Sequence, residues 1–241
     1  MPTPLETYLT EIRRVRSSGA ATEETSYYDA LSAALNAIGA RLKPKVFCLS
    51  KLEDQGAGFP DFWLYTANQL RRGSLRQPVP DQLPERGVVE AKPLKDDVWE
   101  IAERKQALDY WERYGLVLTT NYRAFLLVGR DQFGRRVNLE HFELADSPQA
   151  FWELTATPRK VPAALTLRFE EFLKRVHLHN APLTQPKDVA WFLASYARDA
   201  LARIEEAGEI PALDLVRSTL EEALGMKFEG AKGRHFFHST L

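Results

Sequence analysis

Cysteine is almost absent from this sequence, whose 241 residues include one, Cys48, in the apolar run VFCL. A single cysteine forms no internal disulfide, and it excludes a zinc site built from several thiolates. We therefore expect Cys48 to be a small buried hydrophobic side chain. Chains without disulfides are typical of reducing compartments, so the expected location is the cytoplasm.

Long apolar runs, net charge and phosphate-binding loops are also missing. No stretch approaches the roughly 18 consecutive apolar residues of a membrane helix, and no signal peptide begins the chain, so no membrane association is expected. Lys and Arg total 32 against 33 for Asp and Glu, so any surface that attracts DNA must be local. A GxxxxGK[ST] loop is lacking, which predicts no ATP site, and the five histidines show no ligand spacing.

Two short apolar runs contain acidic residues. GFPDFWLY places Asp61 after a proline, and GVVEAKPL places Glu90 two residues before Lys92. If the runs are neighbouring strands, two carboxylates and a lysine meet on one sheet, an arrangement that can hold a divalent metal against a phosphate. The competing interpretation is a structural ion pair, Asp61–Lys92 or Glu90–Lys92, because unpaired charges beside an apolar sheet are costly.

The elements predicted around these runs form an α/β unit. Helical spacing covers 5–16, a second helix runs to Gly39, and the clearest helix covers 96–114 and ends at Gly115. Short β-branched or aromatic runs predict strands at 45–49, 59–65, 87–90, 116–120 and 123–129. The predicted fold class is therefore α/β, with a mixed central sheet flanked by helices and then an all-helical unit.

The chain divides into two predicted domains, 1–155 and 156–241. The second is helical, because 163–178, 186–207 and 211–225 have helical periodicity and prolines separate them. Within the first, 67–86 holds three prolines and four arginines and predicts a long surface excursion. Its arginines either follow a DNA backbone or are simply solvated.

Three further polar residues are candidates for the same site. Glu24 shares a predicted helix face with Leu31 and Leu35, so it is either a third acid of the site or an acid that complements the helix dipole. Gln106 and Tyr110 are four apart and share a helix face, where an amide and a phenol could hold a phosphate or simply pack.

Together, the runs ATEETSYYDAL, GFPDFWLY, VVEAKPL, KQALDYW and LVLTTNYRAFLLV resemble the PD-(D/E)xK nuclease superfamily, whose core is a helix, three strands, a helix and a further strand. They are similar to the N-terminal nuclease domain of single-chain type IIG and type ISP restriction-modification enzymes. The resemblance implies a Mg²⁺-dependent DNA endonuclease of phage defence in a bacterial or archaeal cytosol, with Mn²⁺ as a substitute. The alternatives are a non-catalytic DNA-binding module and a RecB-like exonuclease on the same fold.

The tail GMKFEGAKGRHFFHSTL resembles the helical connector that leads into an N6-adenine methyltransferase. It implies that this chain is a fragment without an S-adenosylmethionine site of its own. Methyltransferase and target-recognition domains would then be covalently linked partners beyond the sequence. Dimerisation is a possible requirement for cutting both strands.

The resemblance also assigns roles to individual residues. It implies that the metal ligands are Asp61, Glu90, the carbonyl of Ala91 and Glu24, although the adjacent Glu23 leaves open which of the two faces the metal. Lys92 becomes the catalytic lysine, and Gln106 with Tyr110 becomes the QxxxY motif. Arg104 and Lys105, beside this motif, are expected to contact neighbouring phosphates.

Overall fold

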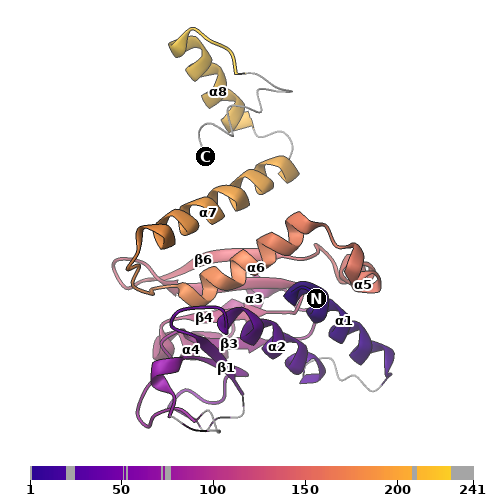
Figure 1. Cartoon of the computed structure of the whole chain (residues 1–241), viewed down its shortest axis with the longest axis vertical. Coiled ribbons are helices and arrows are strands. Elements are labelled where there is room, and N and C mark those ends of the chain that lie inside the picture. Colours follow the sequence, from indigo (N-terminus) through magenta and orange to yellow (C-terminus); the bar gives the residue numbers. More distant parts are fainter. Residues whose placement is uncertain are drawn as a thin grey trace. The chain divides into compact units, whose positions relative to one another are not determined.

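A mixed six-stranded sheet lies at the centre of the first part of the chain, with its strands side by side in chain order (Figure 1). The computed structural model describes residues 2–19, 25–50, 52, 54–71, 73, 77–207 and 211–228. The strands are β1 (Val46–Leu49), β2 (Phe62–Thr66), β3 (Val88–Ala91), β4 (Val117–Thr120), β5 (Ala124–Arg130) and β6 (Arg136–Glu143). This sheet, flanked by helices, confirms the predicted α/β fold class with a mixed central sheet.

One pair of strands is parallel. Strands β3 and β4 run in the same direction, whereas every other neighbouring pair is antiparallel. A parallel pair needs a crossover connection, and here it contains α3 (Val98–Glu103) and α4 (Lys105–Tyr114). Strand β3 is therefore an interior strand with a partner on each side, and all four of its residues are buried.

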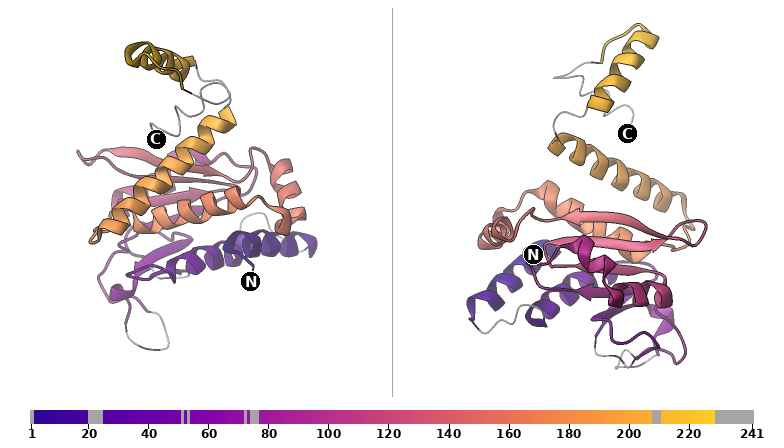
Figure 2. Two further views of the ribbon diagram at one scale, coloured as in Figure 1. Left: turned by 45° about the horizontal axis from the view of Figure 1, so that its top comes forward. Right: turned by 180° about the vertical axis from the view of Figure 1, so that it is seen from behind.

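Four helices cover one face of the sheet: α1 (Pro4–Ser17), α2 (Tyr28–Gly39), α5 (Pro148–Ala156) and α6 (Ala163–Leu178). Their apolar side chains pack with residues from every strand in one continuous cluster. Helix α1 contacts α2, and both lie near the N-terminus in Figure 2. Helix α1 begins where the Thr3 hydroxyl accepts a hydrogen bond from the Glu6 N–H at 3.1 Å. Cys48 is buried in this cluster, as predicted. Most of the core lies on this face.

Helices α3 and α4 cover the other face with two smaller clusters. The prediction of one continuous helix over 96–114 is wrong, because Arg104 is extended (ψ 145°) and separates the two. The interruption allows Val98 to pack on β5 while Tyr110 packs on β2 and β3. Helix α4 ends, as predicted, at Gly115, whose φ of 75° suits glycine.

A second glycine fixes the start of β3. Gly87 has a φ of 75°, and a Cβ added there would lie 2.2 Å from the carbonyl oxygen of Leu116. Only glycine fits this position. The N–H of the next residue, Val88, donates to that same oxygen at 3.1 Å. The close contact therefore holds β3 at a fixed position against β4.

The segment 67–86 leaves the sheet between β2 and β3, as predicted. Hydrogen bonds from one glutamine side chain join the two ends of its described part. The Gln69 side-chain amide donates to the Leu83 carbonyl at 2.6 Å, and its oxygen accepts from the Glu85 N–H at 3.0 Å. Gln69 itself is buried. The base of this excursion is therefore part of the fold rather than a loose loop.

One of its four arginines does not fit either predicted role. Arg86 is 6% exposed, and its guanidinium donates to the His179 carbonyl at 3.4 Å. It is neither solvated nor available to follow a DNA backbone, because it fills the space between this segment and the end of α6. Arg72 and Arg76 lie outside the described residues.

The compact unit around the sheet extends from Met1 to Ala181, beyond the boundary expected at residue 155. Two elements in this stretch, β6 and α5, were not predicted. Helix α6 agrees with the prediction in its bounds, but Phe169 and Phe172 pack against Phe125 and Phe142 of the sheet. It therefore belongs to the core of the first unit.

The second unit, Pro182–Leu241, is helical where it is described. It contains α7 (Pro186–Ala207) and α8 (Pro211–Leu224), close to the predicted 186–207 and 211–225. The aromatic tail compared above with a methyltransferase connector lies largely in 229–241, outside the described residues. None of the described helices combines the length and apolar character that crossing a membrane requires.

Candidate active site on strands β2 and β3

Strand β3 carries the predicted glutamate and leads to the predicted lysine. Residues two apart on a strand point to the same side, so Glu90 and Lys92 project with Val88 toward the face that α4 covers. The Lys92 N–H donates to the Thr120 carbonyl at 2.9 Å and continues the pairing with β4. The Lys92 ammonium lies 2.7 Å from Glu90 Oε1, and the two side chains are 17% and 1% exposed. An ion pair is thus held almost entirely inside the protein.

Asp61 reaches the same place from the neighbouring strand. Strand β2 pairs with β3 so that Phe62 lies opposite Val89. In an antiparallel pair, the residue before Phe62 therefore lies beside the residue after Val89. The Ala91 N–H donates to Asp61 Oδ2 at 2.7 Å. The structure brings Asp61 against the strand segment that carries Glu90 and Lys92.

A tyrosine that was not predicted for the site holds the other oxygen of Asp61. The Tyr28 hydroxyl donates to Asp61 Oδ1. Tyr28 is the first residue of α2, and its ring meets Phe62 edge-on at a centroid separation of 5.2 Å. In the sequence Tyr28 looks like one apolar member of a helix face. The only signal that it contacts a polar group is its hydroxyl, which usually forms a hydrogen bond when the ring is buried.

Tyr110 and Gln106 line the site from α4, and they contact each other as their spacing predicts. Gln106 Nε2 donates to the Tyr110 hydroxyl oxygen at 2.8 Å. Burial raises the pKa of Tyr110 to about 12, and the nearby carboxylates of Glu90 and Asp61 contribute to that rise. The Tyr110 ring packs in one cluster with Val88, on the side of β3 to which Glu90 and Lys92 also point. Tyr110 is therefore a wall of the site.

Arg104 and Lys105 lie at the junction of α3 and α4, and each is paired with a nearby acid. Arg104 Nη2 lies 2.7 Å from Asp96 Oδ2, and Lys105 Nζ lies 2.7 Å from Asp109 Oδ2. Their side chains are 42% and 89% exposed. Neither contacts the site acids, but both remain open to a partner from solvent.

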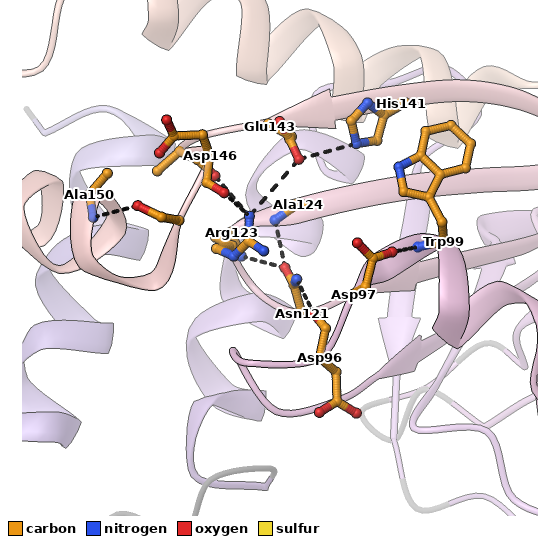
Figure 3. A network of polar contacts seen from close by, with 12 residues as sticks. Asp96, Asp97, Trp99, Asn121, Arg123, Ala124, His141, Glu143, Asp146 and Ala150 are labelled. Carbon is orange, nitrogen blue, oxygen red and sulfur yellow. Dashed lines mark hydrogen bonds and ion pairs between the residues drawn. The ribbon is translucent and has the colours of Figure 1, made fainter.

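The segment that follows Lys92 is fastened to the turn between β4 and β5 (Figure 3). Asn121, fully buried, donates from Nδ2 to the Asp96 carbonyl at 2.7 Å and accepts at Oδ1 from the Ala124 N–H at 2.8 Å. The Asp97 side chain then caps the start of α3. The backbone beyond Lys92 is therefore held in place by the sheet.

The segment that leads to Asp61 is shaped by another acid. Asp54 Oδ1 accepts hydrogen bonds from the N–H groups of Gly56, Ala57 and Gly58 at 2.7, 3.1 and 2.8 Å. These bonds, that from Gly56 foremost, hold the pKa of Asp54 below its usual range. An ionised Asp54 thus closes a tight loop directly before the site.

The oxygen atoms gathered here suit a magnesium ion. Mg²⁺ is usually held by one or two carboxylates, together with water and phosphate oxygens. Asp61, Glu90 and the Ala91 carbonyl provide donors of that kind. Among the residues described, no three or more His, Cys, Asp or Glu side chains gather as a metal site. Glu23 and Glu24, one of which was predicted as a third acid, lie outside the described residues.

No protein-family model matches this sequence, and no curated protein matches it either. Among solved structures, the chain is similar to one titled "cryoEM structure DrdV-DNA complex". The match covers 63% of this chain and 94% of the other, with 15% sequence identity and a TM-score of 0.42.

Proposed function

We propose that this protein is a Mg²⁺-dependent DNA endonuclease, the cleavage part of a restriction-modification or related phage-defence enzyme. One observation carries the proposal: the interior strand β3 and the residue after it carry a buried carboxylate and a lysine 2.7 Å apart, beside a second carboxylate at the start of β2. The motif resemblance in the sequence points to the same residues.

The competing interpretation is that Glu90 and Lys92 form a structural ion pair. Taking both charges out of water costs several kcal/mol per ion, even after relaxation. A structural pair offsets that cost when it joins separate elements, but these residues are already neighbours along one chain segment. A site for a cation and a phosphate gives the two buried charges a use beyond their contact with each other.

Each side chain would have a separate part in phosphodiester hydrolysis. Asp61 and Glu90 would hold Mg²⁺, which supplies positive charge at the phosphate and lowers the pKa of water. Lys92 would donate a hydrogen bond that orients the attacking water or a phosphate oxygen. Tyr110 accepts from Gln106, which leaves its hydroxyl proton available to a phosphate oxygen.

DNA would lie against the exposed side of this site. Arg104 and Lys105 are the charged groups proposed to contact phosphates next to the one that is cut. Nothing in the sequence resembles a helix-turn-helix or zinc finger, so base recognition would come from linked domains. Cutting both strands would then need two nuclease units, one for each strand.

Supercoiled plasmid provides the test. We expect wild-type protein to nick or linearise it in Mg²⁺ or Mn²⁺ and not in EDTA. The Lys92→Gln variant, which keeps a hydrogen-bond donor but lacks the charge, should be slower by about 100-fold or more. The matched control is Lys160→Gln, an exposed lysine in the short 3₁₀ helix Pro158–Lys160, which should cut at the wild-type rate. Cleavage by Lys92→Gln at that rate would exclude the assignment.

The same assay separates the two alternatives. A RecB-like exonuclease would leave circular plasmid intact and degrade the linear form in the presence of metal. A non-catalytic module would retard DNA on a gel without cutting either form, and Lys92→Gln would then behave as wild type.

A further inference from the structure

The carboxylate of Asp61 is held on both sides by the protein. Oδ2 accepts the Ala91 N–H from β3 at 2.7 Å, and Oδ1 accepts the Tyr28 hydroxyl from α2. The first donor is a backbone group of an interior strand and cannot move without the sheet. With Oδ2 held by the strand, the Tyr28 hydroxyl is the contact from α2 that limits rotation of the carboxylate about its last torsion angle.

Tyr28 is itself well placed for that task. Its ring meets Phe62, the residue after Asp61, edge-on at 5.2 Å, and its backbone starts α2. The neighbouring Tyr27 is buried against Tyr122 and Trp152, which anchors the start of the helix to the core. The phenol thus approaches Asp61 from a fixed element, and its hydroxyl donates to the carboxylate.

We infer that Tyr28 is a positioning residue for the metal ligand Asp61. This inference rests on the proposed function. By donating to Oδ1, the hydroxyl holds the carboxylate in one orientation against the strand segment that carries Glu90, and each carboxylate oxygen still has a lone pair for a cation. Partners of this kind that orient a metal ligand change metal affinity by about 10- to 100-fold when they are lost.

Calorimetric titration of the whole chain with Mn²⁺, in the absence of DNA, tests the inference. The variants are Tyr28→Phe, which removes the hydroxyl and keeps the ring against Phe62, and Asp61→Asn. The matched control is Tyr8→Phe, which removes a buried hydroxyl that donates to the Tyr122 carbonyl at 2.7 Å in the core. Thermal unfolding of each variant is measured in parallel.

We expect the dissociation constant for Mn²⁺ to rise about tenfold in Tyr28→Phe, to become unmeasurably large in Asp61→Asn, and to stay unchanged in Tyr8→Phe. The melting temperature should fall in Tyr8→Phe and hardly change in Tyr28→Phe, which separates a positioning role from a structural one. Wild-type affinity in Tyr28→Phe, with binding lost in Asp61→Asn, would overturn this inference and leave the proposed function standing. Absence of Mn²⁺ binding by the wild-type protein would overturn both.

Discussion

Two buried ion pairs in this protein look alike and differ in what they connect. Glu90 and Lys92 lie 2.7 Å apart with side chains 1% and 17% exposed, and Glu140 and Arg175 lie 2.8 Å apart with side chains 9% and 2% exposed. The second pair links β6 to α6, elements far apart in sequence. The first links two positions on one chain segment.

The difference separates charges that serve the fold from charges that do not. Arg175 fastens a core helix to the last strand of the sheet, so the pair contributes a tertiary contact that offsets part of its desolvation cost. The Glu90–Lys92 contact joins two positions that the chain already holds close together, so the contact itself adds no link between separate elements. Stability is commonly lower than it could be where residues are kept for activity. The three predictions below test this division.

The largest effect is expected on the α6 side. Arg175→Ala removes the guanidinium that faces the buried Glu140 carboxylate, and breaking a buried pair in this way costs about 3–5 kcal/mol in the free energy of unfolding. Urea unfolding measures the change. The Mn²⁺ affinity of the fraction that remains folded should equal that of the wild type, since the pair lies outside the site. A loss of less than about 1 kcal/mol would remove the contrast between the two pairs.

A histidine two residues further along α6 should make the same region sensitive to acid. His177 is fully buried with Nδ1 2.7 Å from the Leu173 carbonyl, and burial, assisted by the nearby Arg86 charge, lowers its pKa from 6.5 to about 4. The folded protein therefore keeps His177 neutral at pH values where the unfolded chain binds a proton. Its contribution to stability is intact above about pH 6.5 and is lost as the pH falls toward 4, by about 3 kcal/mol in total.

Urea unfolding between pH 7 and pH 4 measures this loss in the wild type and in His177→Gln, whose amide can still contact Leu173. The variant should show a shallower decline over that window. An identical decline in both proteins would assign the acid sensitivity to other groups.

The smallest effect on stability is expected at the site. Glu90→Gln removes a buried charge, and Lys92, at 17% exposed, can turn toward water. We therefore expect the free energy of unfolding without metal to fall by about 1 kcal/mol at most, less than in Arg175→Ala, because the remaining charge of Lys92 can reach solvent. Metal should stabilise the wild type alone, by about 2.7 kcal/mol at a concentration of 100 times the dissociation constant. Thermal unfolding with and without Mn²⁺ checks both statements, and a large loss in the metal-free variant would make Glu90 a structural residue.

Much of this site could be predicted because its residues carry local signals. The run GVVEAK is apolar, β-branched and bounded by glycine, so β3 could be expected from the sequence, and period-two geometry then sets Glu90 and Lys92 on one side. The four-residue spacing of Gln106 and Tyr110 predicted their contact in the same way. Whether these residues bind metal or phosphate stays a prediction.

The elements that escaped prediction lack such signals. Strand β6 (RVNLEHFE) has polar residues on both of its faces, and it is a strand because its backbone pairs with β5. The extended residue Arg104 is neither glycine nor proline, and the helix is interrupted there because α3 and α4 pack on different clusters. Tyr28 and Asp61 are 33 positions apart, and they meet where the start of α2 packs its Tyr28 ring against Phe62. Tertiary contacts decide all three.

The tight contact of Gly87 with Leu116 has a consequence for which side of the sheet is reactive. Side chains alternate along a strand, so a shift of β3 by one residue would turn Glu90 into the large apolar core and bring Val89 to the position beside Tyr110. A methyl group at Gly87 would strike the Leu116 carbonyl and favour such a shift. Gly87, which has no side chain, thus fixes the register of β3 against β4, and this register decides which side chains reach the face with Glu90 and Lys92.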